Sequence, residues 1–470
     1  MATTRNIVII PFMQLIRFIV IALLLFAVPS WATPKAQYKI GNSTNKKWSN
    51  YKSANSTKKV KKISPSIKSS KTTSTNSSLS ESTIKTEPAI EKTNPKTSAP
   101  KYRLSLPPVP LRISYQSNGR AVLNQIPRFD LGDKSQVTGE TSDNEIVYFT
   151  LEAELQRYAD RLIQKARAPH IAMVVMQPST GKILAIAEKS STYNDLSLHS
   201  GFPAASLFKV ITAAAAVEQA GMSPMQSISF RGGNYTLSQW NFNPDPRKDQ
   251  RQMSAAEALG RSCNPVFGRI ALNYLNAFEL RNYARLFAFN EAIPFEAVLP
   301  QSSAFVPVDA YELSRTAAGF GAVRISPVHA ATIMSAIANQ GLMPQPILIE
   351  KIVSENGEIK YRSRPTLLKR TVRPETARTL LNMMEYTTTI GTSRREFGES
   401  KQNKLKNLRV AAKTGTLRGD NPSGLNHWFI ATAPIENPKV AVAIVAVDGG
   451  GLDSKPSHLG RLLMEKYILG

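Results

Sequence analysis

From about residue 145, apolar and polar positions alternate along the chain with the spacings of regular secondary structure. Between residues 151 and 166 an apolar side chain recurs every third or fourth position, which predicts an amphipathic helix with Thr150 as its N-cap. Two apolar runs, 171–177 and 182–187, flank a turn that contains Gly181 and predict a β-hairpin. Strands joined this closely are antiparallel, so the pattern argues against a doubly wound parallel sheet.

Further periodic segments follow. The alanine-rich run 202–221 predicts a helix of three to four turns that ends at Gly221. Residues 410–416, 427–433 and 440–447 have the composition of strands. Helices and antiparallel strands are therefore both expected in the same globular part of the chain.

The N-terminus has a different pattern. Residues 18–28 form an uncharged apolar run, preceded by Arg17 and followed by the small residues Ser30 and Ala32, as at a signal-peptidase site. We interpret residues 1–32 as either a cleaved signal peptide or a retained membrane anchor. Both alternatives place the rest of the chain outside the cytoplasm.

Residues 33–101 predict a disordered basic linker. Ser and Thr account for 23 of residues 41–100, and residues 33–105 contain 16 Lys and Arg against 3 Asp and Glu. Such a segment buries too little apolar surface to offset its chain entropy. Its lysines suit anionic lipid or acidic wall polymers, although a solvated spacer without a partner explains them equally well. Nucleic acid is not expected as a partner, because aromatic residues are rare here.

Composition limits the chemistry of the remaining chain. With 42% hydrophobic residues, the protein can bury a sizeable core, and its formal net charge is +25. A single cysteine excludes an intramolecular disulfide, a cysteine-based zinc site and an iron–sulfur cluster. Only five histidines are present, scattered along the sequence. We therefore expect no metal site and no cofactor. Residues 102–143 are interpreted as a small N-terminal lead-in, and residues 144–470 as the main globular domain.

The first candidate motif is Ser206-Leu207-Phe208-Lys209, at the start of the alanine-rich helix. Residues i and i+3 share a helix face, so the Lys209 amine is expected near the Ser206 hydroxyl. A serine is a poor nucleophile until a neighbouring base takes its proton, and lysine can act as that base only if burial or a nearby positive charge lowers its pKa. By itself this spacing is equally consistent with an ordinary helix start.

The second candidate motif is Ser262-Cys263-Asn264, which the flanking Gly260 and Pro265 place in a loop between two helices. A hydroxyl and an amide there would relay a proton and hydrogen-bond a substrate amide. Helix capping explains the same residues without any catalytic role. Cys263 is expected to be a packed small hydrophobe.

The third candidate motif is Lys413-Thr414-Gly415-Thr416, which occurs once in the chain and lies in a predicted strand. The lysine would attract a substrate carboxylate, and the threonine hydroxyls would add donors. We expect Gly415 to remove a side chain where substrate lies against the strand edge. An ordinary strand end is the alternative interpretation.

The three motifs together, in this order, resemble the set found in penicillin-binding proteins and class A β-lactamases, with S-C-N as the second member. Flanking stretches at 325–346, 383–397 and 427–434 are also similar to that family, and the resemblance covers about residues 144–470. It implies an α/β (α+β) fold of the penicillin-binding transpeptidase and β-lactamase type. In this fold helices flank an antiparallel sheet, and a further subdomain is all helical.

The resemblance also implies a role for each motif residue. Ser206 would attack a D-Ala–D-Ala stem peptide with Lys209 as its base, and Ser262 would protonate the leaving amine. Asn264 would hold the substrate backbone. Lys413 would lower the pKa of Lys209 through like charge and would grip the substrate carboxylate with Thr414 and Thr416. Gly415 belongs to the same substrate-binding strand, and the backbone N–H groups of Ser206 and Thr416 would form the oxyanion hole.

By this resemblance the protein is expected to be a D,D-transpeptidase that β-lactams acylate. Three alternatives stay open: a D,D-carboxypeptidase, a β-lactamase and a non-catalytic sensor of stem peptides or β-lactams. Peptidoglycan stem peptides, β-lactams and other cell-wall synthesis proteins are the expected partners, with membrane contact through the N-terminus. The expected location is the periplasm or the outer face of the inner membrane. Too few residues precede 144 for a glycan-polymerising domain or a large pedestal, so a stand-alone catalytic domain on a stalk is expected.

Overall fold

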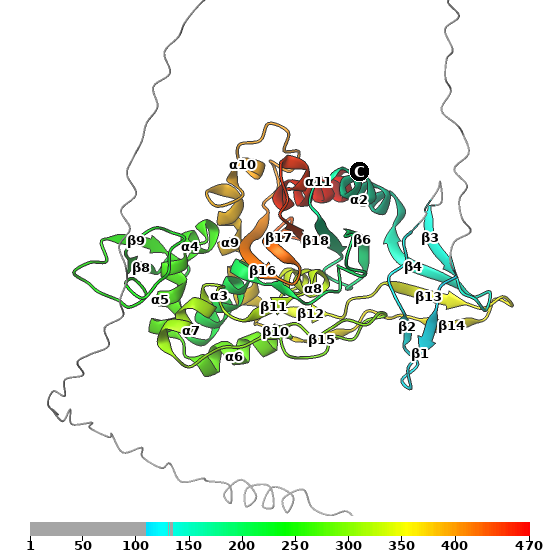
Figure 1. The fold of residues 1–470 in the computed structure, drawn as a ribbon, viewed down its shortest axis with the longest axis horizontal. Helices are drawn as coiled ribbons and strands as arrows, with labels where there is room; N and C mark the ends of the chain where they lie inside the picture. The colour runs from blue at the N-terminus through cyan, green and yellow to red at the C-terminus, as the bar shows by residue number, and fades with distance from the viewer. Residues whose placement is uncertain (1–109, 130, 132–134) are drawn as a thin grey trace, which may run out of the picture. The chain divides into compact units, whose positions relative to one another are not determined.

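The structure, a computed structural model, describes residues 110–129, 131 and 135–470, which belong to one compact unit (Figure 1). The predicted export segment, the basic linker and residues 102–109 of the lead-in lie outside the described residues. Within the described part, every helix is too short or too polar to cross a membrane.

The strands, in chain order, are β1 (Ile113–Tyr115), β2 (Ala121–Leu123), β3 (Gln136–Glu140), β4 (Ile146–Glu152), β5 (His170–Met176), β6 (Ile183–Lys189), β7 (Phe202–Pro203), β8 (Ser227–Phe230), β9 (Arg251–Ser254), β10 (Ser303–Ala304), β11 (Val323–Ile325), β12 (Leu342–Pro344), β13 (Ile349–Val353), β14 (Ile359–Arg362), β15 (Leu367–Arg370), β16 (Ala411–Asp420), β17 (Ser423–Ala433) and β18 (Val440–Val447). The helices are α2 (Ala153–Lys165), α3 (Phe208–Gln219), α4 (Ala255–Arg261), α5 (Asn264–Tyr274), α6 (Ala277–Leu286), α7 (Ala310–Ala317), α8 (Pro327–Ala338), α9 (Pro374–Thr389), α10 (Arg394–Phe397) and α11 (Pro456–Leu469), with 3-10 turns η1 (Ala205–Leu207) and η2 (Leu452–Ser454).

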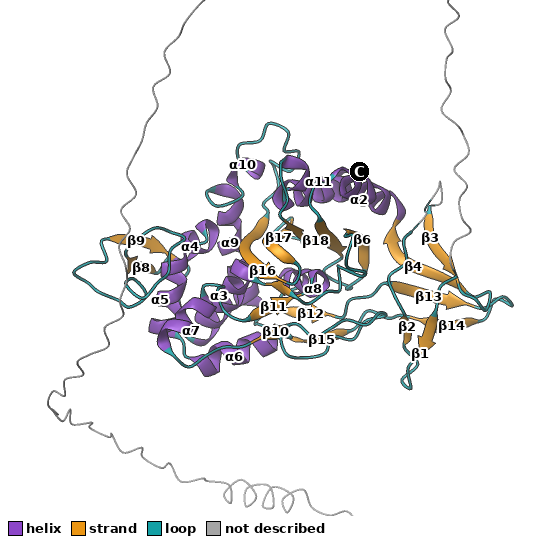
Figure 2. Cartoon of the chain, in the orientation of Figure 1, coloured by secondary structure: helices purple, strands orange, loops and turns teal. Residues whose placement is uncertain are grey.

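A five-stranded antiparallel sheet in the order β16-β17-β18-β5-β6 forms the centre of the fold. Every residue of β18 is buried, because helices α2 and α11 cover one face of the sheet and α8 covers the other (Figure 2). The predicted hairpin is confirmed as β5 and β6, and the predicted strand 440–447 is confirmed as β18. Strand β16, which contains Lys413, lies at one edge of the sheet.

Helices α4, α5, α6 and α7 pack around α3 beside this edge and form the helical subdomain. A short two-stranded ribbon, β8 and β9, is inserted in it (Figure 2). The helix predicted within 202–221 is confirmed for 205–219 as η1 followed by α3, whereas Phe202–Pro203 form β7. The alanine-rich surface of α3 lets neighbouring helices approach closely. The expected antiparallel sheet flanked by helices is therefore confirmed, but the ribbon of β8 and β9 means that the subdomain is not all helical.

A second sheet, in the order β14-β13-β4-β3, was not predicted. Its edge strand β3 comes from the expected lead-in and pairs with β4, while Ala121 and Leu123 of the lead-in belong to the main hydrophobic core. The expected boundary at residue 144 thus falls in the turn between two paired strands, and the domain division itself stays a prediction.

The expectation that Thr150 caps a helix is wrong. Strand β4 continues through Glu152, and Thr150 donates its buried hydroxyl toward the carbonyl oxygens of Ile183 and Ile347 at 2.8 and 2.9 Å. Helix α2 begins only at Ala153, without a side-chain cap. The apolar spacing was read correctly from Leu155 onward, but Leu151 belongs to the alternating pattern of the preceding strand.

Candidate active site

Ser206 lies in η1, a single turn that leads directly into α3. Its neighbour Ala205 has a φ of +50°, a left-handed conformation that turns the chain between β7 and the helix. The Ser206 side chain is partly exposed, and Lys209 Nζ donates a hydrogen bond to Ser206 Oγ at 2.8 Å. The structure therefore brings the two residues of the first motif together at a point that solvent can reach.

Lys209 itself is fully buried. Its ammonium also donates to Asn264 Oδ1 at 2.7 Å and to the carbonyl oxygen of Ala318, which follows α7. Among the described residues, no carboxylate forms an ion pair with this amine. Burial lowers the pKa of Lys209 to about 7, because desolvation disfavours the charged form. A large fraction of neutral amine is thus available near neutral pH to accept a proton.

Lys413 occupies a second buried position, on β16. Its Nζ donates to Ser262 Oγ at 2.9 Å and to the carbonyl oxygen of Thr414 at 2.7 Å. Burial first, and then the like charge of Lys209, hold the pKa of Lys413 well below its usual range. Burial is the main cause of the lowered pKa of both lysines, and the repulsion between their charges acts in the same direction. The expected lowering of the Lys209 pKa by Lys413 stays a prediction.

The second motif is the predicted loop between α4 and α5. Ser262 ends α4 with a φ of +57°, and Asn264 is the first residue of α5. The Asn264 backbone N–H donates to the Asn234 carbonyl at 2.6 Å, and its side-chain Nδ2 donates to the Tyr235 carbonyl at 2.8 Å. These bonds fix the amide so that its oxygen faces Lys209. Cys263 between them is fully buried, as expected, and burial raises the pKa of its thiol to about 11.

Gly415 has a different role from the one expected. A Cβ at this position would lie 3.2 Å from Ala205 Cβ and 3.3 Å from Trp428 Cβ. The missing side chain therefore lets η1, the turn that contains Ser206, approach the strand closely, and it leaves no open space at this point. Lys413 and Gly415 are buried, and Thr414 and Thr416, which alternate with them along β16, are partly exposed and exposed.

The accessible hydroxyls of the third motif are those of Thr414 and Thr416, of which Thr416 is exposed. Thr416 Oγ1 lies 3.5 Å from His427 Nδ1, and Thr414 Oγ1 lies 2.6 Å from Thr392 Oγ1. Thr392 lies in the stretch 383–397, which resembles the family but does not by itself indicate a role for this residue. The Ala318 carbonyl was missed as well, and no side-chain pattern would have revealed it, because it is a backbone atom.

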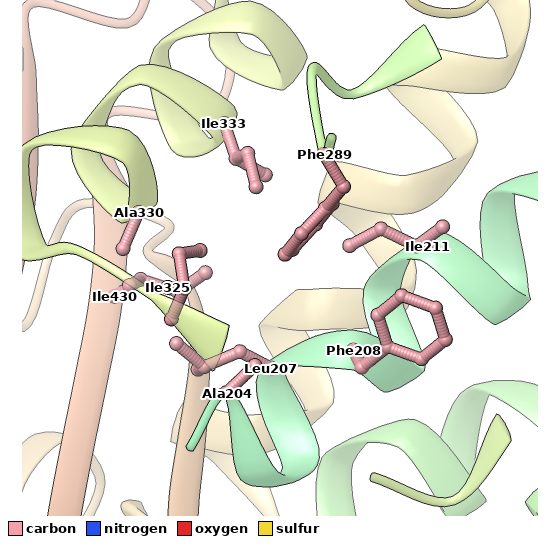
Figure 3. Close-up of a pocket in the computed structure, with 9 residues that line it drawn as sticks. All are labelled: Ala204, Leu207, Phe208, Ile211, Phe289, Ile325, Ala330, Ile333 and Ile430. Atoms are coloured by element: carbon pink, nitrogen blue, oxygen red, sulfur yellow. The ribbon is translucent and has the colours of Figure 1, made fainter. Parts of the chain in front are cut away.

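Figure 3 shows an apolar pocket on the inner side of the nucleophile turn. Its lining comes from η1 and the residue before it, α3, the segment after α6, β11, α8 and β17. All nine lining residues are apolar: Ala204, Leu207, Phe208, Ile211, Phe289, Ile325, Ala330, Ile333 and Ile430. These side chains pack behind Ser206 and fix the position of η1. The pocket is part of the core that supports the site.

The site therefore contains a partly exposed serine at a helix start, which a buried lysine contacts. A second serine–lysine pair lies beside it, with its lysine on the edge strand of the sheet. This is the arrangement of a serine acyltransferase site. The sequence profile described as the penicillin binding protein transpeptidase domain matches residues 171–463. The chain belongs to this family.

Curated relatives agree with this assignment. The chain is 28% identical over 316 residues to the peptidoglycan D,D-transpeptidase PbpA of Mycolicibacterium smegmatis, an alignment that covers 59% of this chain and 62% of the relative. It is 25% identical to stage V sporulation protein D of Bacillus subtilis over 64% of this chain and 49% of that protein. The alignments thus span only about half to three fifths of these two relatives.

Solved structures have the same fold. The ceftriaxone acyl-enzyme complex of penicillin-binding protein A from Mycobacterium tuberculosis superposes with a TM-score of 0.56 at 25% identity, covering 68% of this chain and 80% of that one. The D,D-transpeptidase domain of a peptidoglycan glycosyltransferase from Eggerthella lenta superposes with a TM-score of 0.59 at 24% identity, over 77% of this chain and 96% of that domain.

Proposed function

We propose that the protein is a peptidoglycan D,D-transpeptidase that works through an acyl-enzyme on Ser206. The observation that supports this most is the 2.8 Å contact between Ser206 Oγ and Lys209 Nζ, with Lys209 fully buried. Its pKa of about 7 supplies the neutral amine that a general base must have. Membership of the transpeptidase family and the PbpA relative support the choice of substrate, a D-Ala–D-Ala stem peptide.

In the acylation step, Ser206 Oγ attacks the carbonyl carbon of the penultimate D-Ala while its proton passes to neutral Lys209. The backbone N–H groups of Ser206 and Thr416 stabilise the oxyanion, and one such donor contributes about 3 kcal/mol to lowering the barrier. The carbon–nitrogen bond then breaks, D-Ala leaves with a proton on its amine, and the acyl group remains as an ester on Ser206.

Ser262 is the group that we assign to protonate the leaving amine. Its Oγ accepts a hydrogen bond from Lys413, so the Ser262 proton is free to point toward the leaving nitrogen. Lys209 then passes the proton taken from Ser206 to the Ser262 oxygen, which has lost its own proton to the leaving amine, and this balances the step. Asn264 holds both Lys209 and the substrate backbone, and Thr414 and Thr416 receive the terminal carboxylate beside Lys413.

The acyl-enzyme is resolved by an amine of a second stem peptide, which regenerates Ser206 and forms the cross-link. A class A β-lactamase instead needs a glutamate that activates water beside the ester. Glu296 is buried and burial raises its pKa to about 7, but it bonds to the Leu348 N–H and the Tyr361 hydroxyl near the four-stranded sheet. This location favours the transpeptidase over the β-lactamase.

The proposal also covers where the protein acts and what it binds. A stem-peptide substrate requires the catalytic domain to act outside the cytoplasm, which agrees with the predicted export segment at 1–32. β-Lactams, which mimic the dipeptide, are the proposed inhibitors, and other cell-wall synthesis proteins are the proposed partners.

Mass spectrometry after incubation with penicillin tests the proposal. The wild-type protein should acquire a single adduct that persists for hours, and Ser206→Ala should acquire none while keeping its thermal stability, because only one oxygen is removed. Rapid loss of the adduct with hydrolysed penicillin in solution would indicate a β-lactamase. No adduct would indicate a sensor, and an adduct on the variant would overturn Ser206 as nucleophile. Incubation with muropeptides then distinguishes the two activities, because a transpeptidase forms dimers whereas a carboxypeptidase forms trimmed monomers.

A further inference from the structure

The turn between α9 and α10 touches two of the three motif-bearing elements at once. Figure 1 shows α9 between α4 and β16, and residues of α9 contact both. The turn carries Gly391 and Thr392, and hydrogen bonds from Ser393 N–H to the Thr387 carbonyl and from Arg394 N–H to the Gly391 carbonyl hold its shape. Its position is therefore fixed by the end of α9.

The first contact is with the end of α4. Thr392 N–H donates to the Gly260 carbonyl at 3.1 Å. Gly391 approaches so closely that a Cβ on it would lie 2.1 Å from the same oxygen. Gly260 in turn leaves no room for a Cβ of its own, which would lie 2.5 Å from Tyr386 Cβ. The backbone two residues before Ser262 is thus packed directly on this turn.

The second contact is with β16. Thr392 Oγ1 lies 2.6 Å from Thr414 Oγ1, a short hydroxyl–hydroxyl hydrogen bond. The Thr414 carbonyl accepts from Lys413 Nζ, which also donates to Ser262 Oγ. The contacts therefore form a closed ring from Gly260 through Thr392, Thr414 and Lys413 back to Ser262.

A hydroxyl has one proton, so one member of the Thr392–Thr414 pair donates to the other and the acceptor keeps its own proton free. Thr392 is exposed and Thr414 is partly exposed, so the pair is open to an incoming ligand. If Thr392 donates, the Thr414 proton points outward and can bond an anion, and each bond of such a chain strengthens the next.

We propose that Thr392 is a positioning residue for substrate carboxylate capture, which acts by donating to Thr414 so that Thr414 donates to the carboxylate. This inference rests on the proposed function, because it assumes that the site acylates carboxylate-bearing ligands. It goes further in assigning a residue outside the three motifs to recognition of the substrate's charged end.

Thr392→Val tests the inference, because it removes the hydroxyl and keeps the shape of the side chain. Capture of a penicillin that carries its free carboxylate should slow about five-fold, as expected for one oriented hydrogen bond, while capture of the methyl ester of the same penicillin should be unchanged. Thr392→Ser should restore the wild-type preference for the acid. Thr389→Val removes another exposed hydroxyl from the end of α9, one that donates to the Glu385 carbonyl, and should change neither rate.

A double-variant comparison separates action through Thr414 from direct contact. If Thr392 acts through Thr414, the combined Thr392→Val and Thr414→Val protein should capture the acid no more slowly than Thr414→Val alone. If Thr392→Val slows capture of the acid and of the ester equally, or slows neither, the inference is overturned. The proposed function would still stand in that case, provided that the wild-type protein is acylated. Absence of any adduct on the wild-type protein would overturn both.

Discussion

Ser206 and Lys209 lie three residues apart on η1 and α3, whereas Ser262 and Lys413 are 151 residues apart and meet only where the α4–α5 loop reaches β16. The distances within the two pairs are nearly the same, 2.8 and 2.9 Å. Helix geometry alone creates the first pair, and only its burial depends on the rest of the fold. The second pair exists only because α4, α9 and β16 are packed in one arrangement. We infer that the first pair carries out the nucleophilic attack, whereas in the second pair Lys413 orients Ser262 for proton transfer to the leaving group.

Replacing Lys209 should have the largest effect. Lys209→Met removes the proposed base and should slow penicillin acylation about 1,000-fold, the middle of the range for general-base catalysis. The apolar replacement removes the cost of desolvating an ammonium but leaves Asn264 Oδ1 and the Ala318 carbonyl without this donor, so the melting temperature should fall by only a few degrees. Adduct formation over time and thermal unfolding measure the two quantities. A loss of less than ten-fold would contradict the role of Lys209 as base.

Replacing Lys413 should have a smaller effect. Lys413→Met leaves Ser262 Oγ without its donor, a loss of about 2 kcal/mol or roughly thirty-fold in acylation rate. The exposed Lys406, in the segment before β16, provides a control in Lys406→Met, which should acylate at the wild-type rate.

The double variant shows whether the second pair acts as a unit. Ser262→Ala combined with Lys413→Met should be no slower than Ser262→Ala alone, because one contact is removed in each case. Fully additive losses would mean that Lys413 acts on substrate independently of Ser262.

The contrast between the two pairs also explains which parts of the site and fold could be predicted from the sequence: those that depend on residues close together in the chain. Ser206 and Lys209 follow from helix periodicity, and the hairpin β5–β6 and strand β18 follow from local apolar runs. Ser262, Asn264 and Lys413 were assigned by resemblance to a family, since no local pattern relates residues so far apart.

The features of the site and fold that the sequence did not predict depend on tertiary packing. The carbonyl groups of Ala318 and Tyr235 orient Lys209 and Asn264, and backbone atoms leave no signature in a sequence. Gly415 was predicted to make room for substrate, but the turn it accommodates is distant in the chain. Thr150 was misassigned because β4 pairs with β13, a partner some 200 residues away, through Phe149 and its neighbours.

The central claim, that burial makes Lys209 a neutral base, is tested most directly by the pH dependence of penicillin acylation. The pKa of Lys209 is about 7 and the neutral form is the active one, so the rate should rise roughly ten-fold from pH 6 to pH 8 and then level off. The same rise should be absent from the residual activity of Lys209→Met. A wild-type rate that is flat across this range, or that rises only near pH 10, would contradict the account.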